Sequence, residues 1–262
     1  MDPKRTMEAY LSKTAFPTVW CPGCGIGTVL YSLLSAIQST SIDPGMVRIV
    51  TGAGCAGKIS KVLVLKSFSV KNGFVIERAL RVLKKDPLSI VVAFLSNPDF
   101  LLSGAKDFIR ACKKQERIVV IYINNLIYTS SQDNVRPITP FMRRSFDGDH
   151  ELPFNIPNLA NSCGASYIAR WTPLRAGWLK YSLVDAFNQP GFSVIEVVSP
   201  CLIFEANKGR IRDTVERMNF YNENTNMDKQ DSWKRLDLRV HGKIVIGKFK
   251  DKTGPMNKSH ED

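Results

Sequence analysis

Ser89-Ile90-Val91-Val92-Ala93-Phe94-Leu95 is a continuous apolar run with no alternation between apolar and polar positions. Such a run is typical of a strand that is covered on both faces. A helical pattern over residues 100–113 follows it, and residues 118–123 form a second fully apolar run. Strand, helix and strand within about thirty-five residues predict a βαβ unit, and so a parallel sheet. Residues 192–198 predict a third buried strand. The sequence therefore predicts an α/β fold, doubly wound around a mostly parallel sheet.

The chain has 262 residues, enough for one large α/β domain with its own core. We expect this domain to span residues 1–207 and a more polar C-terminal extension to span residues 208–262. No stretch is long enough to span a membrane, and the N-terminus lacks the apolar core of an export signal, so a cytoplasmic protein is expected. Six cysteines in such a protein are better explained as metal ligands or buried thiols than as disulfides.

Basic residues outnumber acidic ones by 36 to 24, which gives a formal net charge of +12. This excess suits an acidic protein partner such as a small ferredoxin, or RNA or a large complex. The basic residues are spread along the chain rather than gathered in one tail, and the simplest interpretation is a solvated surface. Composition does not choose between these partners.

Four cysteines lie in settings that favour turns. Cys21 and Cys24 form a C-x-x-C pair, Cys55 lies in the glycine-rich segment 51–57, and Cys201 follows a proline at the end of an apolar run. The spacing of the pair lets both sulfurs reach one soft metal centre. Four thiolates are what an iron–sulfur cubane or a structural zinc ion requires. The alternatives are a zinc hook or a redox dithiol at the pair alone, or buried thiols unrelated to one another.

Ligands of doubly wound sheets bind at the carboxyl ends of the strands. Residues 52–57, 96–99 and 124–128 are loops predicted at that edge. Asn97 and Asn125 follow two of the strands and are 125 − 97 = 28 positions apart, so their side chains can converge on one ion or phosphate. The alternative is a strand-to-loop turn with its own side-chain hydrogen bonds.

These motifs resemble those of the β subunit of 2-oxoacid:ferredoxin oxidoreductases, and the resemblance runs over most of the chain. Residues 20–25, 52–55, 124–128 and 199–201 carry it. It implies a sheet of the thiamine diphosphate-binding type, a [4Fe–4S] cluster, and thiamine diphosphate with Mg²⁺. It also implies oxidation of a 2-oxoacid to an acyl-CoA, with electrons passed to ferredoxin, and an α subunit that supplies the acid which activates thiamine.

The same resemblance assigns site residues by position and leaves the catalytic residues of this chain unknown. The cluster ligands would be Cys21, Cys24, Cys55 and Cys201. The contacts to thiamine diphosphate and its metal would come from Gly52, Gly54, Asn97, Asn125 and the carbonyl group of Ile127.

The thiamine-binding positions depart from the family pattern. Ser96-Asn97-Pro98-Asp99 stands where the family has Gly-Asp-Gly-Asp, so Asn97 replaces the aspartate that binds Mg²⁺. An asparagine offers a carbonyl oxygen but no charge, whereas Mg²⁺ beside a diphosphate prefers a carboxylate. Asn72-Gly73-Phe74 replaces His-Gly-Arg, and residues 129–132 replace a glycine-rich loop. We therefore expect weakened binding of thiamine diphosphate and Mg²⁺.

Two functions are compatible with this pattern. The chain is either the β subunit of an active oxidoreductase, or an inactive paralogue that keeps the fold and cluster as a structural or redox module, or as a basic surface for RNA or a large complex. An apolar side chain such as Phe74 filling the diphosphate space would favour the second.

Overall fold

The protein, seen here as a computed structural model, is described over residues 7–12, 19–70, 73–129, 135–137, 154–199, 201, 214–227 and 243–253. Its helices and strands in chain order are η1 (Met7–Tyr10), α1 (Gly25–Ser39), η3 (Pro44–Met46), β1 (Val47–Thr51), α2 (Gly54–Gly57), α3 (Ile59–Val62), β2 (Ser67–Ser69), α4 (Val75–Lys85), β3 (Ile90–Ser96), α5 (Asn97–Asp99), the π-helical turn η4 (Phe100–Gly104), α6 (Ala105–Lys113), β4 (Ile118–Asn124), β5 (Ile127–Thr129), β6 (Val135–Pro137), α7 (Ile156–Ser162), β7 (Tyr167–Trp171), η6 (Pro173–Arg175), α8 (Ala176–Phe187), β8 (Ser193–Val198), α10 (Thr214–Asn224), β9 (Thr225–Met227) and β10 (Ile244–Asp251).

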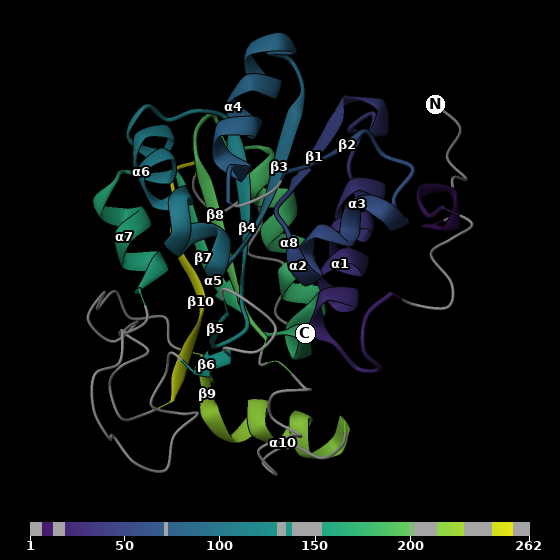
Figure 1. Cartoon of the computed structure of the whole chain (residues 1–262), viewed down its shortest axis with the longest axis vertical. Helices are drawn as coiled ribbons and strands as arrows, with labels where there is room; N and C mark the ends of the chain where they lie inside the picture. Colours follow the sequence, from purple (N-terminus) through teal and green to yellow (C-terminus); the bar gives the residue numbers. More distant parts are fainter. Residues whose placement is uncertain are drawn as a thin grey trace.

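An eight-stranded sheet forms the centre of the molecule, with the strand order β2-β1-β3-β4-β8-β7-β10-β9 (Figure 1). β10 runs antiparallel to β7, and every other pair of neighbours in this sheet is parallel. A separate small hairpin joins β5 and β6. The prediction of a doubly wound, mostly parallel α/β fold is confirmed.

Helices cover both faces of the sheet. Figure 1 shows α4, α6 and α7 on one side and α1, α3 and α8 on the other. Each layer has its own hydrophobic core against the sheet, and side chains of β3, β4 and β8 alternate between the two cores. This explains why these strands read as uninterrupted apolar runs, since both faces of each are buried.

Two segments were placed by the structure rather than by the sequence pattern. The weakly patterned residues 58–72 contain α3 and the edge strand β2, and residues 71–72 lie outside the described part. The segment after residue 208 contributes β9 and β10 to the main sheet, where β10 pairs with β7. The predicted helix over residues 100–113 begins with the wider turn η4 before α6.

The carboxyl edge of the parallel strands gathers residues from distant parts of the chain. The chain leaves β4, passes through β7 and returns to β8, which lies directly beside β4. In α/β sheets of this kind, ligands bind outside the carboxyl ends of the strands. Asn97 follows β3, Asn124 ends β4 and Ser199 follows β8, so all three lie at this edge. Within the described residues, no helix combines the length and apolar character needed to cross a membrane.

Candidate functional site

The carboxyl edge of the sheet brings together the three segments that carry the predicted cluster cysteines. Cys55 follows β1, Cys201 follows β8, and the Cys21–Cys24 turn leads directly into α1. The backbone N–H of Cys24 donates to the carbonyl of Cys21 at 2.9 Å, which closes the turn. Gly23 has a φ of +76° there, a backbone conformation that favours glycine. The tight turn predicted from Pro22 and Gly23 is therefore present.

Direct contacts hold these segments against one another. The indole Nε1 of Trp20 donates to the carbonyl of Cys55 at 2.8 Å, and the Lys58 Nζ donates to the carbonyl of Val19 at 2.9 Å. On the other side, a Cβ added to Gly25 would lie 2.3 Å from Ser199 Oγ, so the start of α1 is pressed against the Cys201 segment. These contacts fix the positions of the four thiols relative to one another.

The thiols are close enough to affect one another's charge. Burial raises the pKa of Cys24, a hydrogen bond from the Ile26 backbone lowers it, and the thiols of Cys55, Cys21 and Cys201 raise it further. The pKa of Cys55 is likewise raised first by burial of its sulfur, then lowered by Lys58 and raised by Cys201 and Cys21. Burial and the neighbouring sulfurs therefore favour the neutral thiol at Cys24 and Cys55.

The four sulfurs are not gathered as tightly as the ligands of one ion. Among the described residues, no group of three or more His, Cys, Asp or Glu side chains is arranged to hold a single metal ion. The other two cysteines lie apart from this edge, in α6 and at the end of α7. Burial raises the pKa of Cys112 to about 12, with Cys163 adding to it, so this thiol stays protonated and suits no metal.

A cluster of three asparagine side chains closes the strand ends next to the cysteines. The Nδ2 of Asn97 donates to Asn125 Oδ1 at 3.0 Å and to Asn124 Oδ1 at 3.2 Å, and Asn97 is 1% exposed. The hydroxyl of Tyr122 donates to Asn97 Oδ1 at 2.8 Å. The backbone N–H of Ser199 donates to the carbonyl of Asn124 at 2.8 Å, which joins this amide cluster to the Cys201 segment. Asn97 and Asn125 therefore converge as the sequence predicted, but on each other.

A buried ion pair supports the amide cluster from inside the sheet. Asn124 Nδ2 donates to Glu196 Oε1 at 2.8 Å, and Arg170 Nε donates to Glu196 Oε2 at 2.6 Å. The side chains of Glu196 and Arg170 are both 0% exposed. Burial, and then the negative charges of Glu196 and Asp99, raise the pKa of Tyr122 well above its usual range, so its hydroxyl remains a donor.

Asp99 is enclosed by glycines and not directed at a ligand. Its carboxylate accepts hydrogen bonds from the backbone and hydroxyl of Ser96, at 3.1 and 2.6 Å, and from the backbone of Ala53. Burial, the largest cause, raises the pKa of Asp99 above its usual value. A Cβ on Gly52 would lie 2.1 Å from the Asp99 carboxylate, and one on Gly73 would lie 2.7 Å from its carbonyl oxygen. Gly52, a predicted cofactor contact, and Gly73 are therefore both required for close packing around Asp99.

The remaining predicted contacts are placed less directly. Gly54 has a φ of +71°, a conformation that favours glycine, in the turn before Cys55. A Cβ on Gly54 would meet no atom within 4 Å, so the backbone conformation, and not lack of space, explains the glycine. Ile127 opens β5, and nothing is described of its side chain. Residues 130–132 of the altered loop lie outside the described residues.

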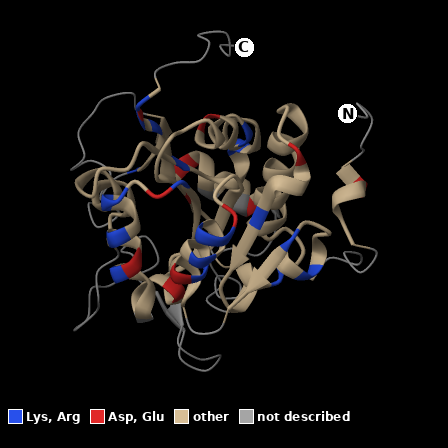
Figure 2. Ribbon diagram, turned by 90° about the horizontal axis from the view of Figure 1, so that it is seen from above, with Lys and Arg blue, Asp and Glu red and all other residues tan. Residues whose placement is uncertain are grey.

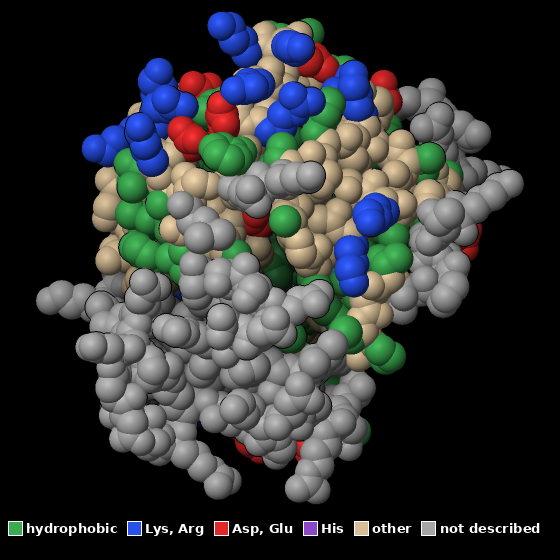
Figure 3. Space-filling model, in the orientation of Figure 1, with side chains coloured by type: hydrophobic (Ala, Val, Ile, Leu, Met, Phe, Trp, Pro, Cys, Tyr) green, Lys and Arg blue, Asp and Glu red, His purple; other side chains and the backbone are tan. Residues whose placement is uncertain are grey.

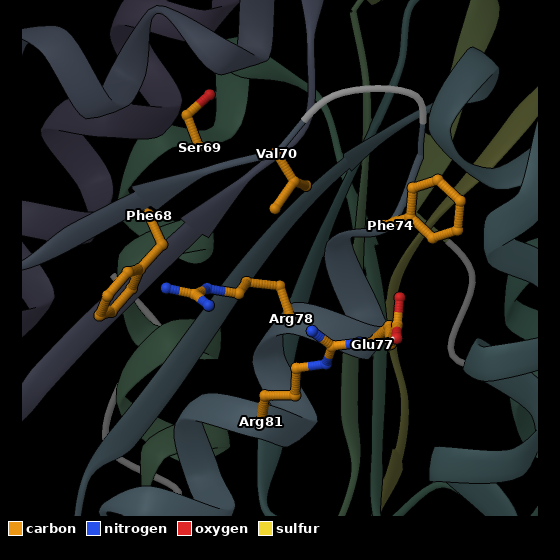
Figure 4. Close-up of a pocket in the computed structure, with 7 residues that line it drawn as sticks. All are labelled: Phe68, Ser69, Val70, Phe74, Glu77, Arg78 and Arg81. Atoms are coloured by element: carbon orange, nitrogen blue, oxygen red, sulfur yellow. Dashed lines mark hydrogen bonds and ion pairs between the residues drawn. The ribbon is translucent and has the colours of Figure 1, made fainter.

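Phe74 lies at the start of α4, outside the amide cluster. It is 48% exposed and lines a surface cavity of about 410 Å³ beside the edge strand β2, together with Phe68, Arg78 and Arg81 (Figure 4). The Arg78 guanidinium lies over the Phe68 ring, 4.6 Å from its centre, and Arg81 pairs with Glu77 at 2.5 Å. The position of Phe74 therefore gives no support to the inactive alternative, which a Phe74 side chain filling the diphosphate space would have favoured.

A group of exposed basic side chains lies at the opposite, amino edge of the sheet. It is the basic surface formed by the last turns of α4 and α6, with Arg81, Lys84, Lys85, Arg110, Lys113, Lys114 and Arg117. Figure 3 shows Lys and Arg gathered along the top of the molecule, and Figure 2 looks down on this side. An electron carrier bound there would be separated from the cysteines by the length of the strands.

The donor set at the strand ends does not fit a magnesium diphosphate. Mg²⁺ is bound in proteins mainly through carboxylates and phosphates in near-ideal octahedral geometry. Here Asn97 turns two N–H donors toward the neighbouring oxygens, and the nearby carboxylates of Asp99 and Glu196 are held by Ser96 and Arg170.

Glu196, Arg170 and Tyr122 were not identified from the sequence; a charged residue inside the apolar run 192–198 was the available signal.

Comparison with known proteins gives consistent results. The model of the family described as thiamine pyrophosphate enzyme, C-terminal TPP binding domain, matches residues 67–197. The 2-oxoglutarate synthase subunit KorB of Methanothermobacter marburgensis is 32% identical over 249 residues, which cover 94% of this chain and 87% of that protein. KorB of Archaeoglobus fulgidus is 33% identical over 73% of each chain. The β subunit of 2-oxoacid:ferredoxin oxidoreductase 1 of Aeropyrum pernix is 26% identical over 71% of this chain and 59% of its own.

The fold comparison agrees. The solved structure of 2-oxoglutarate:ferredoxin oxidoreductase from Magnetococcus marinus, with 2-oxoglutarate, coenzyme A and succinyl-CoA bound, superposes with a TM-score of 0.78. The match covers 96% of this chain and 87% of that chain at 19% identity, so it shows a shared fold.

Proposed function

The chain belongs to the β subunits of the 2-oxoacid:ferredoxin oxidoreductases, and from this premise we propose that it is the cluster-bearing subunit of such a complex. Cys21, Cys24, Cys55 and Cys201 hold a [4Fe–4S] cluster, through which electrons from the oxidation of a 2-oxoacid pass toward ferredoxin. The observation that carries the proposal is the convergence of three distant chain segments, in which the thiols of Cys21 and Cys201 lie close enough to raise the pKa of both Cys24 and Cys55.

A cubane suits these thiols better than a single zinc ion. Zn–S bonds of about 2.3 Å place the sulfurs of a tetrahedral site about 3.8 Å apart. A cubane binds each thiolate at a different iron, so its sulfurs lie further apart. The effect of the neighbouring thiols on the pKa of Cys24 and Cys55 indicates that the sulfurs lie near one another, as either site requires, and membership of the family favours the cubane. When bound, the cluster supplies one-electron redox chemistry.

The protein groups around the thiols have identifiable roles in this proposal. Lys58 lowers the pKa of Cys55 and so favours the thiolate that iron binds. Trp20 and Gly25 hold the N-terminal turn against the other two segments. Cys55 lies in an exposed turn, which gives a path for electrons to a carrier at the surface. The complex also needs an α subunit for the carbon chemistry, as membership of the family implies.

The substrate of the complex would be a 2-oxoacid, oxidised with coenzyme A to an acyl-CoA. Relatives named 2-oxoglutarate synthase reach 32–33% identity, so 2-oxoglutarate is the first substrate to assay. A second candidate function is a redox module that keeps the cluster without the carbon chemistry. The amide cluster at the strand ends favours it, because it offers no carboxylate to a metal.

Iron and sulfide analysis of the anaerobically purified chain tests the proposal. We expect about four iron and four sulfide per chain, with an EPR signal after reduction. Changing any of the four ligands to serine, as in Cys55→Ser, should lower this content and remove the native signal. Cys112→Ser is the matched control and should keep both, since that residue lies away from the edge. Zinc in place of iron, or equal loss in the control, would contradict the proposal.

A further inference from the structure

In the amide cluster, side-chain oxygens surround the amide nitrogen of Asn97 in the way that oxygen ligands surround a bound cation. Two side-chain oxygens, Asn124 Oδ1 and Asn125 Oδ1, point at Asn97 Nδ2 from 3.2 and 3.0 Å. We propose that the amide nitrogen of Asn97 takes the place of a divalent cation here, so that this chain does not coordinate magnesium diphosphate at its strand ends. The inference concerns these strand ends and is independent of the cluster.

The hydrogen bonds that hold the side chain of Asn97 define which of its atoms faces Asn124 and Asn125. Tyr122 donates to Asn97 Oδ1 at 2.8 Å from within the sheet, so the oxygen is turned inward and the amide nitrogen outward. A protonated phenol is a donor, and Tyr122 is 3% exposed and surrounded by core. Reversing the amide would leave three oxygens facing one another with no hydrogen between them.

The neighbouring asparagine is fixed just as firmly. Asn124 Oδ1 also accepts from the backbone N–H of Leu126 at 3.1 Å, so both of its lone pairs are engaged. Asn124 Nδ2 donates to Glu196, whose second oxygen accepts from Arg170. Asn124 cannot turn toward a cation without breaking this buried chain of hydrogen bonds.

No other described carboxylate is placed to supply the missing charge. Asp99 accepts from Ser96 and lies against Gly52, and Glu196 is paired with Arg170. Pro98 removes a backbone N–H that a phosphate would use. Mg²⁺ gives up its hydration water reluctantly, and neutral amides that already hold hydrogen bonds do not compensate for that loss.

The test is metal binding by the full chain, with Mn²⁺ as the probe in the presence of thiamine diphosphate, measured by EPR and calorimetry. The wild type should bind Mn²⁺ no better with the diphosphate than the free diphosphate does. Asn97→Asp restores one charged ligand of the same shape and should raise the affinity about 10- to 150-fold. Asn161→Asp, at the half-buried end of α7 where Lys250 donates to the side chain, adds the same charge away from the edge and should change nothing.

A second variant keeps the test decisive if Asn97→Asp does not fold. Tyr122→Phe removes the hydrogen bond that turns the Asn97 oxygen inward, and it should give a smaller but measurable gain in Mn²⁺ binding. Tight Mn²⁺–diphosphate binding by the wild type would overturn the proposal, as would the absence of any gain in both variants. Iron and sulfide content should be unchanged in every variant, which separates this result from the fate of the cluster.

Discussion

Replacing Glu196 with glutamine tests how far the strand ends depend on one buried charge pair. The substitution keeps an oxygen that can accept from Asn124 Nδ2 but leaves the Arg170 guanidinium, 0% exposed, without its carboxylate at 2.6 Å. Removing one partner of a buried ion pair costs about 3–5 kcal/mol, because the other charge stays buried. Each kcal/mol shifts the melting temperature of a domain of this size by about 2–4 °C, so Glu196→Gln should lower it by about 6–20 °C.

The assay is urea and thermal unfolding of the full chain, with two comparisons. Glu77→Gln breaks the ion pair with Arg81, whose side chain is 66% exposed, and should cost only about 0.3–0.5 kcal/mol. The double variant Glu196→Gln with Arg170→Met removes both charges and should recover much of the loss. A loss below about 1 kcal/mol in Glu196→Gln, or a double variant no more stable than the single one, would refute the reasoning.

Three further predictions concern the same edge and its surroundings. Gly52→Ala should destabilise the fold, because the new Cβ would lie 2.1 Å from the Asp99 carboxylate. The control Gly27→Ala, on α1, adds a Cβ that meets nothing within 4 Å and should stabilise the protein by about 0.5–1 kcal/mol. The urea midpoints of the two variants measure the difference. Burial raises the pKa of Asp99, so the contribution of this carboxyl group to stability is complete below its unfolded pKa of about 3.8. That contribution is lost as the pH rises through the raised pKa of the folded state. In urea titrations, the stability of the wild type relative to Asp99→Asn should therefore increase as the pH is lowered from 7 toward 4. Lys61→Glu, at an exposed position of α3 close to Cys55, should slow the reduction of an acidic carrier and weaken the salt dependence of that rate. Lys113→Glu, on the basic surface, should change neither. Equal effects of the two variants in stopped-flow kinetics would show that the carrier docks elsewhere.

The parallel sheet could be predicted because its central strands consist almost entirely of apolar residues, as strands buried on both faces do. Every residue of β4 and β8 is buried, and apolar runs of this kind occur only where helices cover both faces. The short strand β2 and the helix α3 could not be predicted in the same way, since half-exposed edge elements of three or four residues have too little periodicity. Nothing local in β10 shows that it joins the sheet at β7, because that pairing spans more than seventy positions.

The candidate site was predictable in its residue types but not in their contacts. The meeting of Asn97 and Asn125 follows from the topology, because both side chains lie at the ends of neighbouring parallel strands. Whether they face an ion or each other depends on Tyr122, a residue that the pattern of β4 marks only as core. Gly52 was predicted as a cofactor contact, and the structure adds that the Asp99 carboxylate lies where a side chain on Gly52 would be.

The amide cluster and the cysteine segments at the carboxyl edge are joined by direct contacts through Ser199. The Ser199 N–H donates to the Asn124 carbonyl at 2.8 Å, and Ser199 lies against Gly25 beside the C-x-x-C turn. A metal at the strand ends would therefore also steady the Cys201 segment. In this chain Asn97, Glu196 and Arg170 supply that rigidity through hydrogen bonds and a buried ion pair. Under the proposals above, these hydrogen bonds and this ion pair hold the cysteine segments in position for a cluster.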